Sequence, residues 1–202
     1  MTLTPKQALE KLIQGNQRFI SGEPEHPNQN AERRAHLTGG QNPFATIFGC
    51  SDSRLAAEVI FDQGLGDMFV VRTAGQVMES TTLGSLEFGV EGLSTPLIVV
   101  LGHDSCGAVK ATKQSLQTGQ LPGGFQRNLV ERIIPAAISA NLPADCSIND
   151  VVREHTRYTV ESILEQSSII AQAVQDNRTA VVGLFYHLAG GMVERVCSSD
   201  NI

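Results

Sequence analysis

The chain has 202 residues, carries a formal net charge of −6 and is 41% hydrophobic, which suits one globular domain with a sizeable core. The acidic balance leaves no basic stripe that could neutralise phosphates, which argues against nucleic acid as a partner. No run is long and apolar enough to span a bilayer, and the N-terminus lacks the layout of a signal peptide. We therefore expect a cytoplasmic protein without a membrane partner.

The N-terminal segment predicts a helix followed by an extended arm. Thr4 can cap this helix, Pro5 suits its first turn and Gln7 completes a capping box. The polar stretch at residues 23–40 contains two prolines and a glycine pair, which favours an extended connection with at most a short helix. We expect residues 1–40 to pack on a partner subunit; the alternative is that they fold back on their own domain.

Four short apolar runs follow, and their content of Val and Ile predicts strands buried on both faces, as in a parallel sheet. They span residues 44–48, 68–71, 97–101 and 180–185. Helical patterns lie between them, at residues 56–61, 82–90, 106–116 and 127–173. This alternation predicts a single-domain α/β fold, with a central, mostly parallel sheet flanked by helices. A last run at residues 192–196 follows a glycine pair and is expected to form an antiparallel edge strand.

Two polar clusters stand directly after the first and third predicted strands. They are GCSDSR at residues 49–54 and GHDSCG at residues 102–107. Open α/β sheets bind ligands outside the carboxyl ends of the strands, at the point where the strand order reverses. A strand order of 2-1-3-4 would place this point between strands one and three, so the two clusters would face each other.

Cys50, His103 and Cys106 have the side chains that zinc prefers, and three protein ligands with one open position are typical of a catalytic site. Cys106 stands near a predicted helix N-terminus, where backbone N–H groups favour a thiolate. We therefore expect one Zn²⁺ per chain. The alternative is that the two thiols are buried structural residues and His103 caps a helix. Cys146 and Cys197 could in principle supply a fourth ligand, but we expect them to be free thiols.

The motif CSDSR, followed about fifty residues later by GHDSCGAV, closely resembles the β-class carbonic anhydrases, and bacterial members in particular. The likeness extends over nearly the whole chain, including the stretch FDQGLGDMFVVRTAG. It implies that Cys50, His103 and Cys106 hold the zinc and that Asp52 and Arg54 form a catalytic dyad. It also implies a homodimer or a dimer-based tetramer, with residues 41–202 as the catalytic α/β zinc domain.

Three further residues match the family more loosely. Gln41 matches a glutamine that in many members orients substrate, and Val77 and Phe88 fall near positions that line the apolar substrate pocket. The alternatives are a solvated turn residue for Gln41 and an ordinary helix-core residue for Phe88. Some bacterial members carry a second, non-catalytic bicarbonate site built on Trp, Arg and Tyr. Arg72 matches that Arg, but Ile47 occupies the Trp position and the chain has no Trp, which argues against this second site.

The resemblance predicts zinc-dependent, reversible hydration of CO2 to bicarbonate and a proton by zinc-bound hydroxide. Asp52, paired with Arg54, would accept a hydrogen bond from the hydroxide; released from Arg54, it could become a conditional fourth zinc ligand. Because two thiolates already neutralise the metal charge, we expect activity to rise with pH above neutral. His187 ends the fourth strand and could shuttle protons, but a hydrogen-bonded or exposed histidine is the preferred interpretation. His155 stands in a polar context and carries no signal.

Two other functions fit parts of the pattern. Carbon disulfide and carbonyl sulfide hydrolases resemble this family and share its zinc ligands, so the motifs do not separate them from carbonic anhydrases. A non-catalytic zinc-binding domain is a further alternative. The presence of both Asp52 and Arg54 argues against it, because a purely structural site does not need the dyad.

Overall fold

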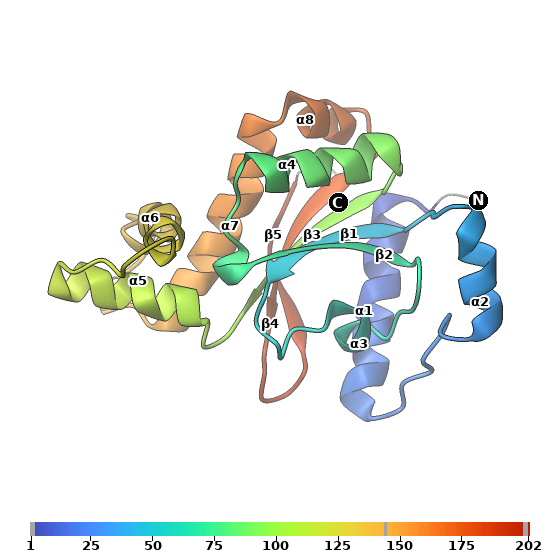
Figure 1. Cartoon of the computed structure of the whole chain (residues 1–202), viewed down its shortest axis with the longest axis horizontal. Helices are drawn as coiled ribbons and strands as arrows, with labels where there is room; N and C mark the ends of the chain where they lie inside the picture. The colour runs from blue at the N-terminus through green and yellow to red at the C-terminus, as the bar shows by residue number, and fades with distance from the viewer. Residues whose placement is uncertain (1–2, 144, 200–201) are drawn as a thin grey trace.

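Across residues 3–143, 145–199 and 202, which the computed structural model describes, one five-stranded sheet forms the centre of the molecule (Figure 1). Its strands are β1 (Ala45–Cys50), β2 (Met68–Thr73), β3 (Leu97–His103), β4 (Ala180–Tyr186) and β5 (Val193–Ser198). The order is β2-β1-β3-β4-β5, with β1 to β4 parallel and β5 antiparallel to β4. This confirms the predicted α/β fold, its strand order and its antiparallel edge strand.

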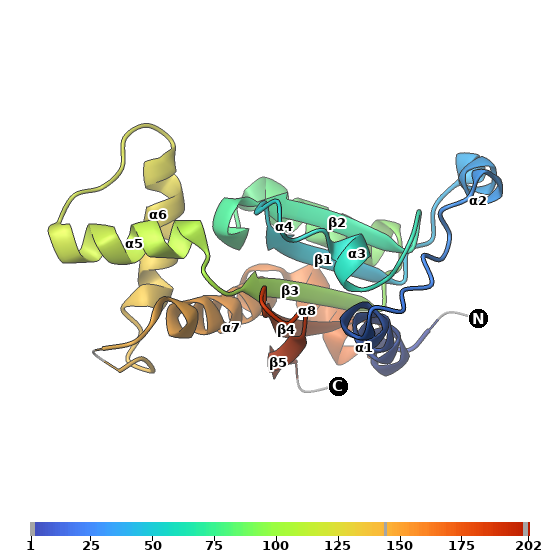
Figure 2. The same ribbon diagram turned by 90° about the horizontal axis from the view of Figure 1, so that it is seen from below.

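Helices cover both faces of the sheet because the central strands are apolar on both sides. Alternate residues of β3 point to opposite faces, and they enter two separate hydrophobic clusters. One cluster includes α1 (Pro5–Ser21) and α3 (Ala57–Ile60). The other includes α4 (Ser80–Glu87), η3 (Phe88–Gly92), α7 (Ile148–Gln166) and α8 (Ser168–Gln175). Two more helices, α5 (Gly107–Thr118) and α6 (Gln126–Ala137), project beyond the sheet (Figure 2).

The region 127–173, which the pattern predicts as one long helical stretch, is divided into α6, α7 and α8. Ser147 starts α7 with a capping box, in which its hydroxyl accepts from the Asp150 N–H and the Asp150 carboxylate accepts from the Ser147 N–H. Ser167 follows the end of α7 and caps α8 by accepting from the Ile170 N–H. Side-chain caps at Ser147 and Ser167 therefore mark where α7 and α8 begin within this region.

The N-terminal helix α1 packs on its own sheet. Thr4 and Gln7 form the predicted capping box. The Asn16 side chain donates to the carbonyl oxygens of Ile60 (3.1 Å) and Gly191 (2.7 Å). The helix is thus anchored at both α3 and the β4–β5 hairpin. The arm that follows contains α2 (Ala31–His36) and η1 (Leu37–Gly39), and its packing on a partner subunit stays a prediction.

Within the described part of the chain, no helix combines the length and the hydropathy that crossing a membrane requires. The cytoplasmic location expected from the sequence stays a prediction.

Candidate metal centre

The carboxyl ends of β1 and β3 bring the three predicted ligands together. The two strands are adjacent and parallel, so their ends lie side by side. Cys50 is the last residue of β1, His103 is the last residue of β3, and Cys106 is the N-cap of α5. One ligand atom from each lies within 4.8 Å of the others, and all three residues are buried. These atoms are close enough to share one metal ion.

The orientation of His103 favours a metal on its Nε2 atom. Its Nδ1 lies 2.9 Å from the carbonyl oxygen of Asp104. Because a carbonyl only accepts hydrogen bonds, Nδ1 carries the proton and Nε2 presents a bare lone pair. Among the residues described, Nε2 is buried without a hydrogen-bond partner. This arrangement is usual for a metal-ligating histidine: one ring nitrogen, here Nδ1, donates to a backbone carbonyl, and the other, here Nε2, keeps a lone pair for the metal.

The two thiols of the cluster affect each other's ionisation. A hydrogen bond from Cys106 lowers the pKa of Cys50, and the same bond raises the pKa of Cys106. The backbone N–H groups of Asp52 and Gly75 also donate to Cys50 Sγ, at 3.4 and 3.2 Å. Two sulfur ligands that can ionise and one imidazole form a donor set that fits Zn²⁺ and leaves a fourth position for a non-protein ligand.

The other two cysteines lie away from this cluster. Cys146 precedes α7, and its carbonyl accepts a hydrogen bond from the Lys113 ammonium group. Cys197 lies on β5. Neither belongs to the group of potential metal ligands found in the described residues, and both are free thiols, as predicted.

Asp52 and Arg54 form a two-pronged ion pair beside the cluster. Arg54 Nε donates to Asp52 Oδ1 at 2.9 Å, and Nη2 donates to Oδ2 at 2.7 Å. These hydrogen bonds hold the pKa of the Asp52 carboxyl well below its usual range. The carboxylate therefore stays ionised near neutral pH. Asp52 is paired with Arg54 here and is not one of the three grouped ligand residues.

Arg72 fastens the loop that carries Cys50 and Asp52. From the end of β2, its guanidinium donates to the carbonyl oxygens of Cys50 (2.9 Å) and Asp52 (2.6 Å). Arg72, the residue that the resemblance matched to a bicarbonate-binding arginine, is thus hydrogen-bonded to backbone carbonyl groups. Ile47, at the matching Trp position, is buried in the core.

A second loop, η2 (Ala74–Gln76), reaches the cluster from the end of β2. It supplies the Gly75 N–H that donates to Cys50. The Gly75 carbonyl lies 3.0 Å from Nε2 of His155, a residue on α7 that is only 4% exposed. The polar neighbours of His155 concealed this position in the sequence. Its spacing of four from Val151 and Thr159, which are both buried, is the signal that could have placed it on the inner face.

The structure does not bring Gln41 or Phe88 to the metal cluster of their own chain. Gln41 precedes β1 and is exposed, so the length of that strand, roughly 16 Å, separates it from Cys50. Phe88 is 52% exposed, and the centre of its ring lies 5.9 Å from that of Phe69, with the two rings tilted by 51°. Phe69 pairs with Thr46 near the start of β1, at the end opposite to the cluster. A substrate role for either residue therefore requires a second copy of the chain.

Val77 lies closer to the cluster. It is buried directly after η2, and its carbonyl accepts from Thr73 Oγ1 at 2.8 Å. Its side chain lies beside Gly75, the residue whose N–H donates to Cys50: a Cβ placed on Gly75 would be 3.8 Å from Val77 Cγ2. Val77 therefore belongs to the segment that contacts Cys50, and its contact with substrate stays a prediction.

His187 is hydrogen-bonded, as the preferred interpretation of the sequence has it. Its Nε2 lies 3.1 Å from Glu194 Oε2, and its ring meets Phe185 edge-on at 5.0 Å. The imidazole is thus engaged on the β4–β5 hairpin.

Comparison with known proteins agrees with this geometry. The family model described as carbonic anhydrase matches residues 45–193. A carbonic anhydrase from Mycolicibacterium smegmatis is 50% identical over 190 residues, covering 94% of this chain and 92% of that protein. Two solved structures share the fold. The β-carbonic anhydrase of Coccomyxa, in complex with acetazolamide, has a TM-score of 0.72 at 22% identity, covering 95% of this chain and 87% of the other. A tetrameric β-carbonic anhydrase of Sordaria macrospora has a TM-score of 0.71 at 21% identity, covering 95% and 98%.

Proposed function

This chain belongs to the β-carbonic anhydrase family of enzymes, and from that premise we propose that it catalyses the zinc-dependent, reversible hydration of CO2 to bicarbonate and a proton. The observation that carries the proposal is the grouping of Cys50, His103 and Cys106 within 4.8 Å, with the Asp52–Arg54 pair on the same loop as Cys50.

We propose that these three residues hold one Zn²⁺ per chain. When bound, zinc supplies a Lewis acid that allows a water molecule to lose a proton near neutral pH. The Cys50 and Cys106 thiolates balance the charge of the ion, so the acidifying effect is weaker than in a site of three neutral histidines. Activity should therefore rise as the pH increases above neutral.

Asp52 is the proposed catalytic carboxylate. Arg54 keeps it ionised and fixed in direction, so it can accept a hydrogen bond from the attacking water and orient that water toward CO2. Breaking the ion pair would release the carboxylate, which could then act as a conditional fourth ligand. Arg54 thus holds Asp52 in the catalytic arrangement.

We further propose a homodimer or a dimer-based tetramer, with Gln41 and Phe88 contributing to the site of the neighbouring copy. β2 is an edge strand whose side chains are mostly half-buried, and the exposed Phe88 ring lies beside Phe69 of this strand. The Sordaria relative is described as tetrameric. The region of residues 1–40 would pack on the partner in the same assembly.

Metal analysis joined to a CO2 hydration assay tests the proposal. Purified protein should contain one zinc per chain and show hydration that increases between about pH 7 and 9 and disappears on chelation. Carbon disulfide and carbonyl sulfide should be offered to the same preparation. Sulfide release with negligible CO2 hydration would overturn the proposal in favour of a hydrolase, a name that none of the relatives described above carries.

A further inference from the structure

Gly75 connects the metal cluster to helix α7. Its N–H donates to Cys50 Sγ at 3.2 Å, and its carbonyl oxygen lies 3.0 Å from Nε2 of His155. The three residues are far apart in the sequence, and each contributes from a different element. A rotation of the Gly75 backbone would change both hydrogen bonds together.

The backbone around Gly75 has an unusual conformation that must be held by its neighbours. Gly75 has φ of 68°, and Gln76 after it has φ of 47°. A non-glycine residue such as Gln76 adopts a positive φ only where its surroundings hold it there. The buried Gln76 amide donates to Thr156 Oγ1 at 3.4 Å, again on α7. Helix α7 thus supports η2 at two successive residues.

The environment of His155 fixes its tautomer and its charge. Because the Gly75 carbonyl only accepts, His155 must carry a proton on Nε2, which leaves Nδ1 bare. Nδ1 is buried without a hydrogen-bond partner among the residues described. Burial lowers the pKa of His155 to about 4. The ring is therefore neutral near pH 7 and permanently presents an N–H donor to Gly75.

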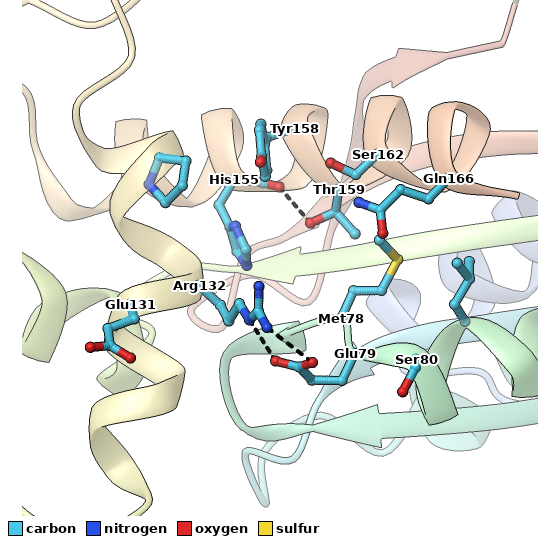
Figure 3. Close-up of a pocket in the computed structure, with 12 residues that line it drawn as sticks. Met78, Glu79, Ser80, Glu131, Arg132, His155, Tyr158, Thr159, Ser162 and Gln166 are labelled. Carbon is cyan, nitrogen blue, oxygen red and sulfur yellow. Dashed lines mark hydrogen bonds and ion pairs between the residues drawn. The ribbon is translucent and has the colours of Figure 1, made fainter.

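Charged groups face the same region from other elements. His155 lines a cavity of about 420 Å³ together with Glu79 and Arg132 (Figure 3). Those two side chains neutralise each other, with Arg132 Nε 2.5 Å from Glu79 Oε1. Glu131, which also lines the cavity, pairs with Arg127 at 2.7 Å. The hydrogen bond to Gly75 and the charge on Cys50 both act against the effect of burial on the His155 pKa. The cavity thus offers no net charge that would ionise the ring.

We propose that His155 is a positioning residue of the metal centre: its Nε2–H holds the Gly75 carbonyl, so that the Gly75 N–H stays directed at the Cys50 sulfur. This inference rests on the proposed zinc function. A hydrogen bond to a thiolate stabilises its charge and limits the electron density that it donates to the metal. Residues that support metal ligands in this way typically change metal affinity or activity 10–100-fold.

Two substitutions separate the hydrogen bond from the packing. His155→Phe keeps a ring of similar size and removes the donor, whereas His155→Gln keeps an N–H near the position of Nε2. Tyr158→Phe is the matched control, because Tyr158 lines the same cavity from α7. Each variant is purified with its metal, and two properties are measured: the rate of zinc transfer to a chelator, and the sulfur-to-metal charge-transfer absorption after cobalt replacement.

We expect His155→Phe to lose zinc about 10–100-fold faster, with a shifted charge-transfer band and a lower kcat at unchanged KM. His155→Gln should restore most of each property, and Tyr158→Phe should match the wild type. A folded His155→Phe protein with wild-type zinc transfer and an unshifted band would overturn the inference. The metal readouts do not depend on CO2 hydration, so a failure of the proposed reaction would be recognised separately.

A measurement on the unaltered protein covers the case in which His155→Phe does not fold. Nitrogen-15 NMR should show a protonated, slowly exchanging Nε2 and an unprotonated Nδ1 for His155. A proton on Nδ1 would mean that the bond to Gly75 does not exist, which would also overturn the inference.

Discussion

The two thiols of the metal cluster are held in different ways. Cys106 is the N-cap of α5. The Cys50 hydrogen bond and burial raise its pKa, and the backbone N–H groups of Ala108 and Val109, in the first turn of that helix, act in the opposite direction. Cys50 ends a strand, and its donors include Gly75, which is 25 residues away in the sequence. Gly75 is in turn held by a residue 80 positions further on. One ligand is therefore supported locally, and the other depends on tertiary structure.

Two ligands of the same chemical type can therefore differ in how strongly substitutions elsewhere in the chain affect them. Substitutions within α5 should leave the N–H groups near Cys106 in place, because the free N–H groups of the first turn are present wherever the helix forms. Changes at η2 or α7 affect Cys50 through several contacts in series. Substitutions outside the cluster should therefore weaken the metal site mainly from the Cys50 side.

The largest effect should come from removing either sulfur, because both are proposed ligands irrespective of their support. Cys50→Ser and Cys106→Ser should each weaken zinc binding by at least about 100-fold, the upper end of the effects of supporting residues, and abolish hydration. Cys146→Ser is the control, since Cys146 lies outside the cluster, and it should keep both. Metal analysis after dialysis provides the measurement. Stoichiometric zinc in either ligand variant would remove that cysteine from the site.

The next largest effect should be a loss of folding stability at acid pH, caused by His155. The pKa of His155 is about 4 in the folded chain, against about 6.5 when unfolded. Between these values only the unfolded state binds the proton, so stability falls as the pH decreases from 6.5 to 4, by up to about 3 kcal/mol. Above pH 6.5 both states are neutral and the contribution is constant.

Urea unfolding of the metal-free protein from pH 7 to 4 measures this dependence. His155→Gln has no titrating group at that position, so its stability should fall less steeply over the same range. Parallel curves for the two proteins would show that His155 is not buried in its neutral form.

Substitutions of two glycines, one beside each cysteine ligand, compare the surroundings of Cys50 and Cys106 directly. Gly75→Ala places a Cβ 2.6 Å from the Ala108 Cβ at a φ of 68°, and should cost about 1–3 kcal/mol of stability. Gly107→Ala, at the start of α5, meets nothing within 4 Å and needs no positive φ. It should be neutral or stabilise by up to about 1 kcal/mol. Denaturant titration with zinc release checks both, and similar losses in the two variants would contradict the comparison.

The same division explains what the sequence could reveal. The strands, the two clusters and the position of Cys106 at a helix start follow from local patterns, and the structure confirms them. The strand order 2-1-3-4 was assumed for the fold class, and the structure confirms it as well. The support of Cys50 by Gly75 and His155 was missed, because no local pattern links residues 80 positions apart. Gln41 and Phe88 lie away from the cluster of their own chain, and their role at substrate stays a prediction. A pattern in one chain does not indicate whether a residue acts in its own copy or in a neighbouring one.

Arg72 should give the smallest effect, because its guanidinium supports Cys50 through the backbone and is exposed to solvent. Arg72→Gln removes at least one of two hydrogen bonds to the loop, each worth about 1 kcal/mol. The CO2 hydration rate should fall by up to about 10-fold, because Asp52 loses its fixed position. The zinc content should not change, because Cys50 remains a ligand. Arg34→Gln, which changes an exposed arginine of the arm, is the charge-matched control. If Arg72 instead bound bicarbonate at a second site, its substitution would relieve inhibition by bicarbonate and leave the uninhibited rate intact. A lower rate at vanishing bicarbonate therefore assigns Arg72 to the loop that carries Cys50 and Asp52.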